Sequence, residues 1–268
     1  MLEKTIPDYL YHYTNINTLA LILKNKTIRF NSLNRVDDLS EGLTNDLGEM
    51  GKYVFVSSWT ETPEESIPFW KMYTKDMGGV RIRLKSSPFR TYRLPKISRD
   101  NFDIDVDKDI YFKPEFLFND RYIVLPKWDI LENVEYTNDP DKLYPKLIKN
   151  DGVNTEMELG IIGKYKRNEW KFQREWRYII IFLPVSLNEL CQLGDNLAQV
   201  IYDRLVAKSS LPFEDLYLNI AVDALNDMEI TLGPCVNEGD KIIVESLTAK
   251  YCPTAIIRNS VLENSIRI

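Results

Sequence analysis

A dense group of charged side chains directly precedes the most apolar strand pattern in the chain, in the stretch KYKRNEWKFQREWRYIIIF from Lys164 to Phe182. Six Lys or Arg and two Glu lie there, a local surplus of four positive charges. Glu175 and Arg177 open the apolar run. Burial raises the pKa of a carboxylate and nearby cations lower it. In either case we expect the Glu175 carboxylate to be fixed by neighbouring groups and not solvated. It is either a functional carboxylate or half of a structural ion pair with Arg177.

The chain has one histidine, His12, within the aromatic stretch YLYHYT near the N-terminus. A neutral imidazole donates one hydrogen bond and accepts another, so it can hold a ligand hydroxyl without adding charge. The alternative is a core strand in which His12 bonds a backbone carbonyl. The stretch itself supports both interpretations.

Hydroxyl and aromatic side chains follow the next apolar run, YVFVSSW. Ser57 and Ser58 can bond a ligand or, as the strand leaves the core, the backbone. A helix predicted from Ile67 to Lys75, with Pro68 in its first turn, places Trp70 and Tyr73 on one face. We expect both rings to lie on a pocket wall.

These side chains must be positioned by short strands, which are predicted at nine places: residues 9–13, 27–30, 53–59, 80–84, 122–125, 133–136, 176–182, 228–232 and 255–258. Helices are predicted near 16–25 and 238–250, and residues 141–165 are expected to be mostly helical. We expect Tyr11–Thr14, Phe55–Ser58 and Glu175–Ile181 to lie in neighbouring strands. The predicted fold is one α+β domain over residues 1–268, with mixed and antiparallel strands around a central cleft and flanking helices.

Composition and charge argue against several classes of protein. The 268 residues carry a net charge of −6, which argues against a generally basic nucleic-acid-binding surface. The three cysteines are far apart and are expected to be reduced, and no apolar run reaches the roughly 18 residues that span a membrane. We therefore expect a cytoplasmic protein with no membrane partner. We predict no metal site, although a nuclease with a metal on Asp37, Asp38 and Glu41 is a minor alternative.

The order of these motifs resembles a bacterial family known as domain of unknown function 2971. The resemblance rests on the His-Tyr-Thr strand, an acidic turn ending at Glu41, the strand ending in Ser, the Trp–Tyr helix and the strand that opens with Glu175. It extends to ITLGP at residues 230–234 and IRNSVL at residues 257–262. The turn and the Gln173-x-Glu175 pair depart from the usual family pattern.

The same motifs are more distantly similar to the ADP-ribosyltransferase superfamily, which uses NAD as substrate. This resemblance implies catalytic roles for Glu175 and His12, with Glu175 stabilising the oxocarbenium charge that forms when nicotinamide leaves. It implies that NAD is held by seven further residues: Tyr13, Thr14, Ser57, Ser58, Tyr73, Gln173 and Arg177. Tyr13 or Tyr73 would stack on nicotinamide, and cations of the basic stretch would meet the pyrophosphate.

Two functions follow. The first is an NAD-dependent ADP-ribosyltransferase or NAD glycohydrolase, such as a bacterial toxin or anti-phage defence effector, whose acceptor is a nucleic acid or a protein. The second is a non-catalytic module on the same scaffold, which binds a nucleotide or a nucleic acid in the basic stretch with Trp170 and Trp176 between its cations.

Overall fold

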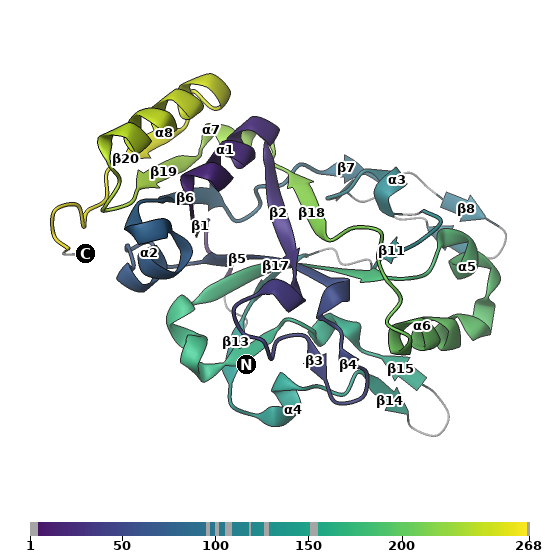
Figure 1. Ribbon diagram of the computed structural model, residues 1–268. Coiled ribbons are helices and arrows are strands. Elements are labelled where there is room, and N and C mark those ends of the chain that lie inside the picture. The colour runs from purple at the N-terminus through teal and green to yellow at the C-terminus, as the bar shows by residue number, and fades with distance from the viewer. Residues whose placement is uncertain are drawn as a thin grey trace.

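The computed structural model describes residues 5–94, 97–99, 102–104, 109–117, 119–125, 129–150 and 155–266. Within these residues ten strands form one mixed sheet (Figure 1). The main path of the sheet is, in order, β11 (Ile123–Val124), β17 (Glu175–Leu183), β5 (Val54–Thr60), β1 (Tyr9–Thr14), β6 (Val80–Lys85), β19 (Glu229–Leu232) and β20 (Ile256–Arg258). Three strands pair beside this path: β12 (Leu131–Asn133) on β17, β2 (Thr27–Ser32) on β5, and β18 (Asp215–Asn219) on β2.

Smaller two-stranded ribbons and helices surround the sheet. The ribbons pair β3 (Leu43–Thr44) with β4 (Gly48–Glu49), β7 (Tyr92–Arg93) with β10 (Asp109–Ile110), β8 (Ile97–Arg99) with β9 (Phe102–Ile104), β13 (Glu135–Thr137) with β16 (Tyr165–Arg167) and β14 (Ile148–Asn150) with β15 (Thr155–Met157). The helices are α1 (Ile16–Asn25), α2 (Ile67–Tyr73), α3 (Pro114–Leu117), α4 (Pro140–Leu143), α5 (Leu187–Gln192), α6 (Leu197–Val206), α7 (Val222–Asn226) and α8 (Glu238–Tyr251). Two 3₁₀ helices matter for the site: η1 (Leu33–Arg35) and η5 (Asn168–Gln173).

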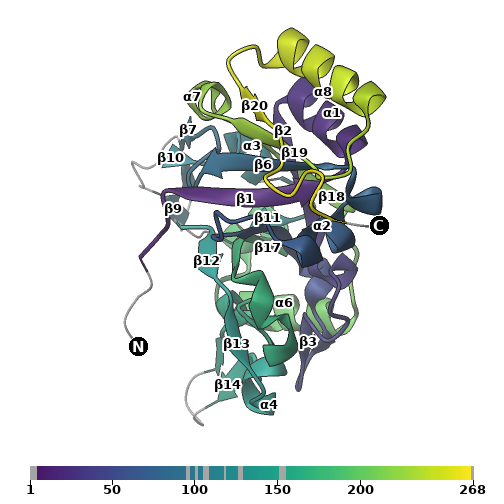
Figure 2. The same ribbon diagram turned by 90° about the vertical axis from the view of Figure 1, so that its left-hand side faces the viewer.

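The centre of the sheet is buried on both faces, and β17 shows this most clearly. All nine of its residues are buried, with alternate side chains entering two separate cores. Trp176 and Tyr178 join the core that α1, α7 and α8 cover, whereas Ile179 and Ile181 join the core that α5 and α6 cover. Figures 1 and 2 show α1 and α8 together at one end of the molecule.

Several predictions from local patterns are confirmed. β1, β5 and β17 lie side by side, with β5 in the middle. Helix α2 begins after Ser66 with Pro68 in its first turn. The three cysteines are free, but Cys252 alone among them is classed as buried. No helix within the described ranges is long and apolar enough to cross a bilayer.

The expected helix over residues 141–165 is wrong. α4 ends at Leu143, and the described residues that follow form short strands and a 3₁₀ turn. Pro145 cannot donate a helical hydrogen bond, and its ring clashes with the preceding helical turn. Gly163 has a φ of +82°, a conformation outside the right-handed helix.

The sheet opens along one edge of β5. On that edge β2 pairs with β5 at Val56 and Phe55, and β1 pairs with it at Thr60. Between these positions, Ser57–Trp59 have no strand partner on that side among the described residues. The gap between β1 and β2 therefore leaves this part of β5 without a neighbouring strand on that edge.

Candidate functional site

A cavity of about 510 Å³ lies at this gap. That volume is within the usual range for a small-molecule site, roughly 300–1,000 Å³. Its lining comes from α1, β1, β2, η1, β5, α2, β16, η5, the start of β17 and β18. All nine residues that the superfamily resemblance singled out are among the lining residues: His12, Tyr13, Thr14, Ser57, Ser58, Tyr73, Gln173, Glu175 and Arg177.

His12 fills part of the space between β1 and β5. Its Nδ1 lies 3.0 Å from the Ser58 carbonyl oxygen, and its ring lies 5.0 Å from the Trp59 ring between centroids. Burial lowers the pKa of His12, more than the bond to Ser58 raises it, so the ring is neutral at neutral pH. Because a carbonyl only accepts, Nδ1 carries the proton and Nε2 is an acceptor. The alternative prediction, a strand in which His12 bonds a backbone carbonyl, is thus confirmed. His12 also lines the cavity.

The side chains of His12 and Glu175 lie on opposite faces of the sheet, and both line the cavity. Glu175 lies opposite Thr60, and Thr60 lies opposite Tyr11, so these three side chains share one face. His12 follows Tyr11 and belongs to the other face. A ligand in the gap would therefore meet the imidazole on one side and the carboxylate on the other.

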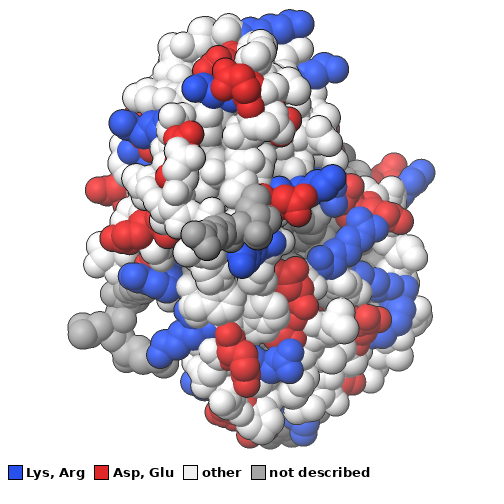
Figure 3. Space-filling model, turned by 60° about the vertical axis from the view of Figure 1, so that its left-hand side comes forward, with Lys and Arg blue, Asp and Glu red and all other residues white. Residues whose placement is uncertain are grey.

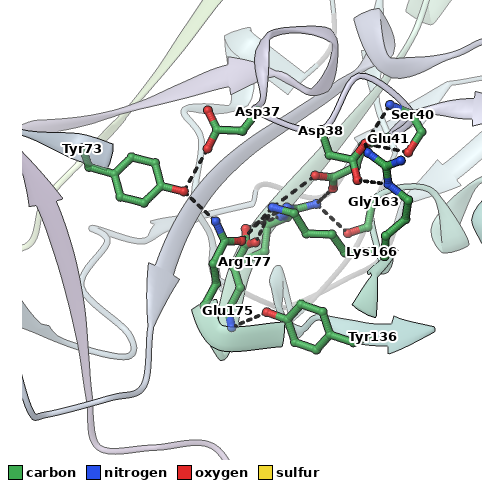
Figure 4. A network of polar contacts seen from close by, with 12 residues as sticks. Asp37, Asp38, Ser40, Glu41, Tyr73, Tyr136, Gly163, Lys166, Glu175 and Arg177 are labelled. Carbon is green, nitrogen blue, oxygen red and sulfur yellow. Dashed lines mark hydrogen bonds and ion pairs between the residues drawn. The ribbon is translucent and has the colours of Figure 1, made fainter. Parts of the chain in front are cut away.

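Glu175 belongs to a cluster of four buried charges whose side chains are at most 4% exposed. Arg177 donates from Nε to Glu175 Oε1 at 2.7 Å and from Nη1 to Glu41 Oε2 and to the Gly163 carbonyl. Lys166 Nζ lies 3.1 Å from Glu175 Oε2 and 3.3 Å from Glu41 Oε1. Two carboxylates and two cations leave the cluster neutral (Figure 4).

These cations keep Glu175 ionised. Burial raises the pKa of Glu175. The opposing effect of Arg177, Lys166 and a hydrogen bond from the Ser58 side chain is larger and lowers the pKa to about 2. The backbone N–H of Glu175 also donates to the Tyr136 hydroxyl at 2.8 Å. The predicted structural pair of Glu175 and Arg177 is confirmed, within a larger cluster than the sequence indicated.

A chain of hydrogen bonds runs from this cluster to α2 (Figure 4). Lys166 Nζ donates to Gln173 Oε1 at 2.8 Å, Gln173 Nε2 donates to the Tyr73 hydroxyl at 2.6 Å, and Tyr73 donates to Asp37 Oδ2 at 2.8 Å. Burial and the Asp37 charge raise the pKa of Tyr73, so its hydroxyl stays protonated. The chain fixes Gln173 and Tyr73 on the cavity wall.

Other candidate side chains are occupied by the protein itself. The Tyr13 ring packs on Phe69 and Trp70, and its hydroxyl accepts from the Ser66 N–H. The Ser57 hydroxyl accepts from Trp59 Nε1 at 3.0 Å. The expectation for the Trp70–Tyr73 face is correct for Tyr73 only, because Trp70 is fully buried and is not among the cavity-lining residues.

The predicted basic surface at residues 164–177 is wrong. Five of its six cations pair with carboxylates: Lys164 with Glu135, Lys166 and Arg177 within the cluster, Arg167 with Asp38, and Arg174 with Glu61. On the face in Figure 3, Lys and Arg side chains lie next to Asp and Glu. Trp176 is buried, with Nε1 bonded to Glu61. Distant acids, which local sequence cannot reveal, neutralise this stretch.

Two charged residues of the lining, Arg29 and Arg35, were not predicted from the sequence. Asp37 was predicted only as a possible metal ligand, and Lys166 only as one cation of the basic stretch. The lining holds four cations and two carboxylates, in a chain of net charge −6. Glu41, which balances the buried cations, lies outside the lining. The acidic turn at residues 37–41 was a visible signal, but Asp38 and Glu41 pair with Arg167 and Arg177, 129 and 136 residues further along the chain.

The acids of that turn are committed to other contacts. Asp38 accepts two hydrogen bonds from Arg167, each 2.9 Å, while Asp37 and Glu41 bind Tyr73 and Arg177. Within the described ranges there is no group of three or more His, Cys, Asp or Glu side chains that could hold a metal ion.

The chain was compared with protein-family models, curated protein sequences and solved structures. None of the three comparisons found a match. The site is therefore interpreted from its own geometry.

Proposed function

We propose that the cavity binds NAD and that the chain is an NAD-dependent ADP-ribosyltransferase or NAD glycohydrolase with an ADP-ribosyltransferase-like fold. One observation carries the proposal. The nine residues that the superfamily resemblance singled out, drawn from three strands, a helix and η5, line a single cavity at a gap in the sheet.

The chemistry of the lining supports cleavage of a glycosidic bond. When nicotinamide leaves, positive charge develops on the ribose, and a preorganised carboxylate beside it lowers the barrier. Glu175 is ionised and immobile, as this role requires. The unprotonated Nε2 of His12 can accept a hydrogen bond from a ribose hydroxyl on the other side of the gap.

A second candidate, a nucleotide-binding module without catalysis, is favoured by one feature of Glu175. Arg177 contacts Oε1, Lys166 contacts Oε2, and the Ser58 side chain bonds the carboxylate. A carboxylate has about four acceptor positions, so these donors occupy most of its capacity. In this alternative the cluster only holds the cavity in shape.

Nicotinamide release from NAD, measured with the full chain, separates the two. The first candidate predicts steady release of nicotinamide, either into water or on addition of a protein or nucleic-acid acceptor. The module predicts that calorimetry detects NAD binding while nicotinamide stays attached. A chain that neither binds NAD nor releases nicotinamide from it would reject both candidates.

A further inference from the structure

The outer part of the cavity lining contains two arginines and a tyrosine that the proposed chemistry does not use. Arg29 lies on β2, Arg35 on η1 and Tyr217 on β18, and all three line the cavity. Their exposed fractions are 49% and 44% for the two arginine side chains and 53% for Tyr217. They are accessible, in contrast to the buried cluster around Glu175.

One carboxylate orients both arginines. Asp215 Oδ1 lies 3.3 Å from Arg29 Nε and 3.3 Å from Arg35 Nη1. Arg35 also pairs with Glu214, which is 81% exposed and therefore contributes little net attraction. Neither acid is among the lining residues. The acids thus hold the guanidinium groups from outside the cavity.

Arg29 retains donors for a ligand. Its Nε contacts Asn31 Oδ1 at 2.8 Å as well as Asp215, and among the described residues its two terminal nitrogens have no recorded hydrogen-bond partner. A guanidinium has five N–H donors in a planar fork that matches two phosphate oxygens. Arg29 can therefore donate hydrogen bonds to a phosphate from its terminal nitrogens while Nε keeps its contacts with Asn31 and Asp215.

Tyr217 supplies an aromatic surface beside this fork. The register of β2 and β18 places Tyr217 directly opposite Arg29, on the same face of the pair. A half-exposed ring next to a guanidinium is a platform on which a nucleobase can stack.

We infer that Arg29, Arg35 and Tyr217 form a subsite for a nucleoside diphosphate, in which the arginines bind the diphosphate and Tyr217 contacts the base. The assignment of this subsite to the ADP half of NAD rests on the proposed function. The subsite replaces the basic stretch at residues 164–177 as the phosphate-binding element, because the only cations of that stretch in the lining, Lys166 and Arg177, are buried in the charge cluster.

Calorimetric titration of the full chain with ADP and with inorganic pyrophosphate tests this subsite. Arg29→Gln and Arg35→Gln are each expected to weaken ADP and pyrophosphate binding roughly tenfold or more, as for loss of a charge-assisted hydrogen bond. Tyr217→Ala is expected to weaken ADP about tenfold and leave pyrophosphate unchanged. The matched control is Arg258→Gln, since Arg258 is 60% exposed, pairs with Glu229 and does not line the cavity.

The outcomes separate this inference from the proposed function. Arginine-dependent ADP binding without any nicotinamide release from NAD upholds the subsite and rejects the enzyme. Nicotinamide release whose KM for NAD is the same in Arg29→Gln, Arg35→Gln and Arg258→Gln upholds the enzyme and rejects the subsite. Absence of ADP binding by the folded wild-type chain also rejects the subsite.

Discussion

At the scale of residues, the molecule concentrates its unusual energetics in four buried charges. Each of Glu41, Lys166, Glu175 and Arg177 is costly to bury alone, and the cluster is tolerable because each charge lies against opposite charges. The local sequence predicted the pair of Glu175 and Arg177, which are two residues apart on one strand. It could not predict Glu41 or Lys166, because burial of these two is set by contacts distant in the chain.

Removing one charge from this cluster should destabilise the fold. Glu41→Gln leaves an uncompensated buried cation and is expected to lower the free energy of unfolding by about 3–5 kcal/mol. Urea unfolding measures this. Glu245→Gln, an exposed site on α8, should change it by less than about 0.5 kcal/mol. Equal effects of the two substitutions would contradict the energetic account of the cluster.

His12 gives a prediction about pH that a single histidine makes easy to assign. Burial lowers the pKa of His12 below its unfolded value of 6.5, so the unfolded chain binds more protons in that range. The free energy of unfolding should therefore be constant above pH 6.5 and fall as the pH drops through the lowered native pKa.

The measurement for His12 is urea unfolding across the range from about pH 5 to about pH 7.5. The Gln side chain does not titrate in this range, so the slope of His12→Gln should be smaller than that of the wild type. Identical slopes for the two proteins would show that the imidazole is not held neutral.

At the scale of elements, sequence periodicity predicted the central strands well and the segment after α4 poorly. β1, β5 and β17 carry continuous apolar or aromatic runs, and their adjacency is as expected. Residues 141–165 lack such a run, and Pro145 and Gly163 favour other conformations. The strands that form there are too short for periodicity to reveal: β14 pairs with β15 within the segment, and β16, at its end, pairs with β13, which precedes the segment.

Close backbone contact between the ends of β6 and β19 supports the wall that carries Thr14. A Cβ on Gly233 would lie 2.3 Å from the Met77 carbonyl oxygen, and one on Gly79 would lie 2.4 Å from that of Thr14. Gly233→Ala is therefore expected to lower the free energy of unfolding by about 1–3 kcal/mol.

The matched control for this contact is Gly160→Ala. A Cβ there would meet nothing within 4 Å, so thermal melting should show an unchanged or slightly higher stability. If both alanine variants melted like the wild type, the two strand ends would not be packed as described.

At the scale of the whole molecule, the decisive feature is the gap that brings residues from distant strands to one cavity. Motif order predicted which residues would gather, and the structure places all nine around the cavity. It did not predict that His12 and Glu175 would reach the cavity from opposite faces, because strand register is a property of the assembled sheet.

The central claim is that Glu175 acts on a ligand in this gap, and Glu41 provides its matched comparison. Both glutamates belong to the same buried cluster and contact the same two cations, yet only Glu175 lines the cavity. The measurement is the rate of nicotinamide release from NAD per folded molecule, for the wild type, Glu175→Gln and Glu41→Gln.

The account predicts that Glu175→Gln lowers this rate by a factor on the order of 10² to 10³, as for loss of a preorganised electrostatic partner. Glu41→Gln should lose a similar amount of stability but keep its rate within about tenfold of the wild type. Equal rate losses in the two variants would contradict the claim, because Glu175 would then serve only to complete a structural cluster of charges.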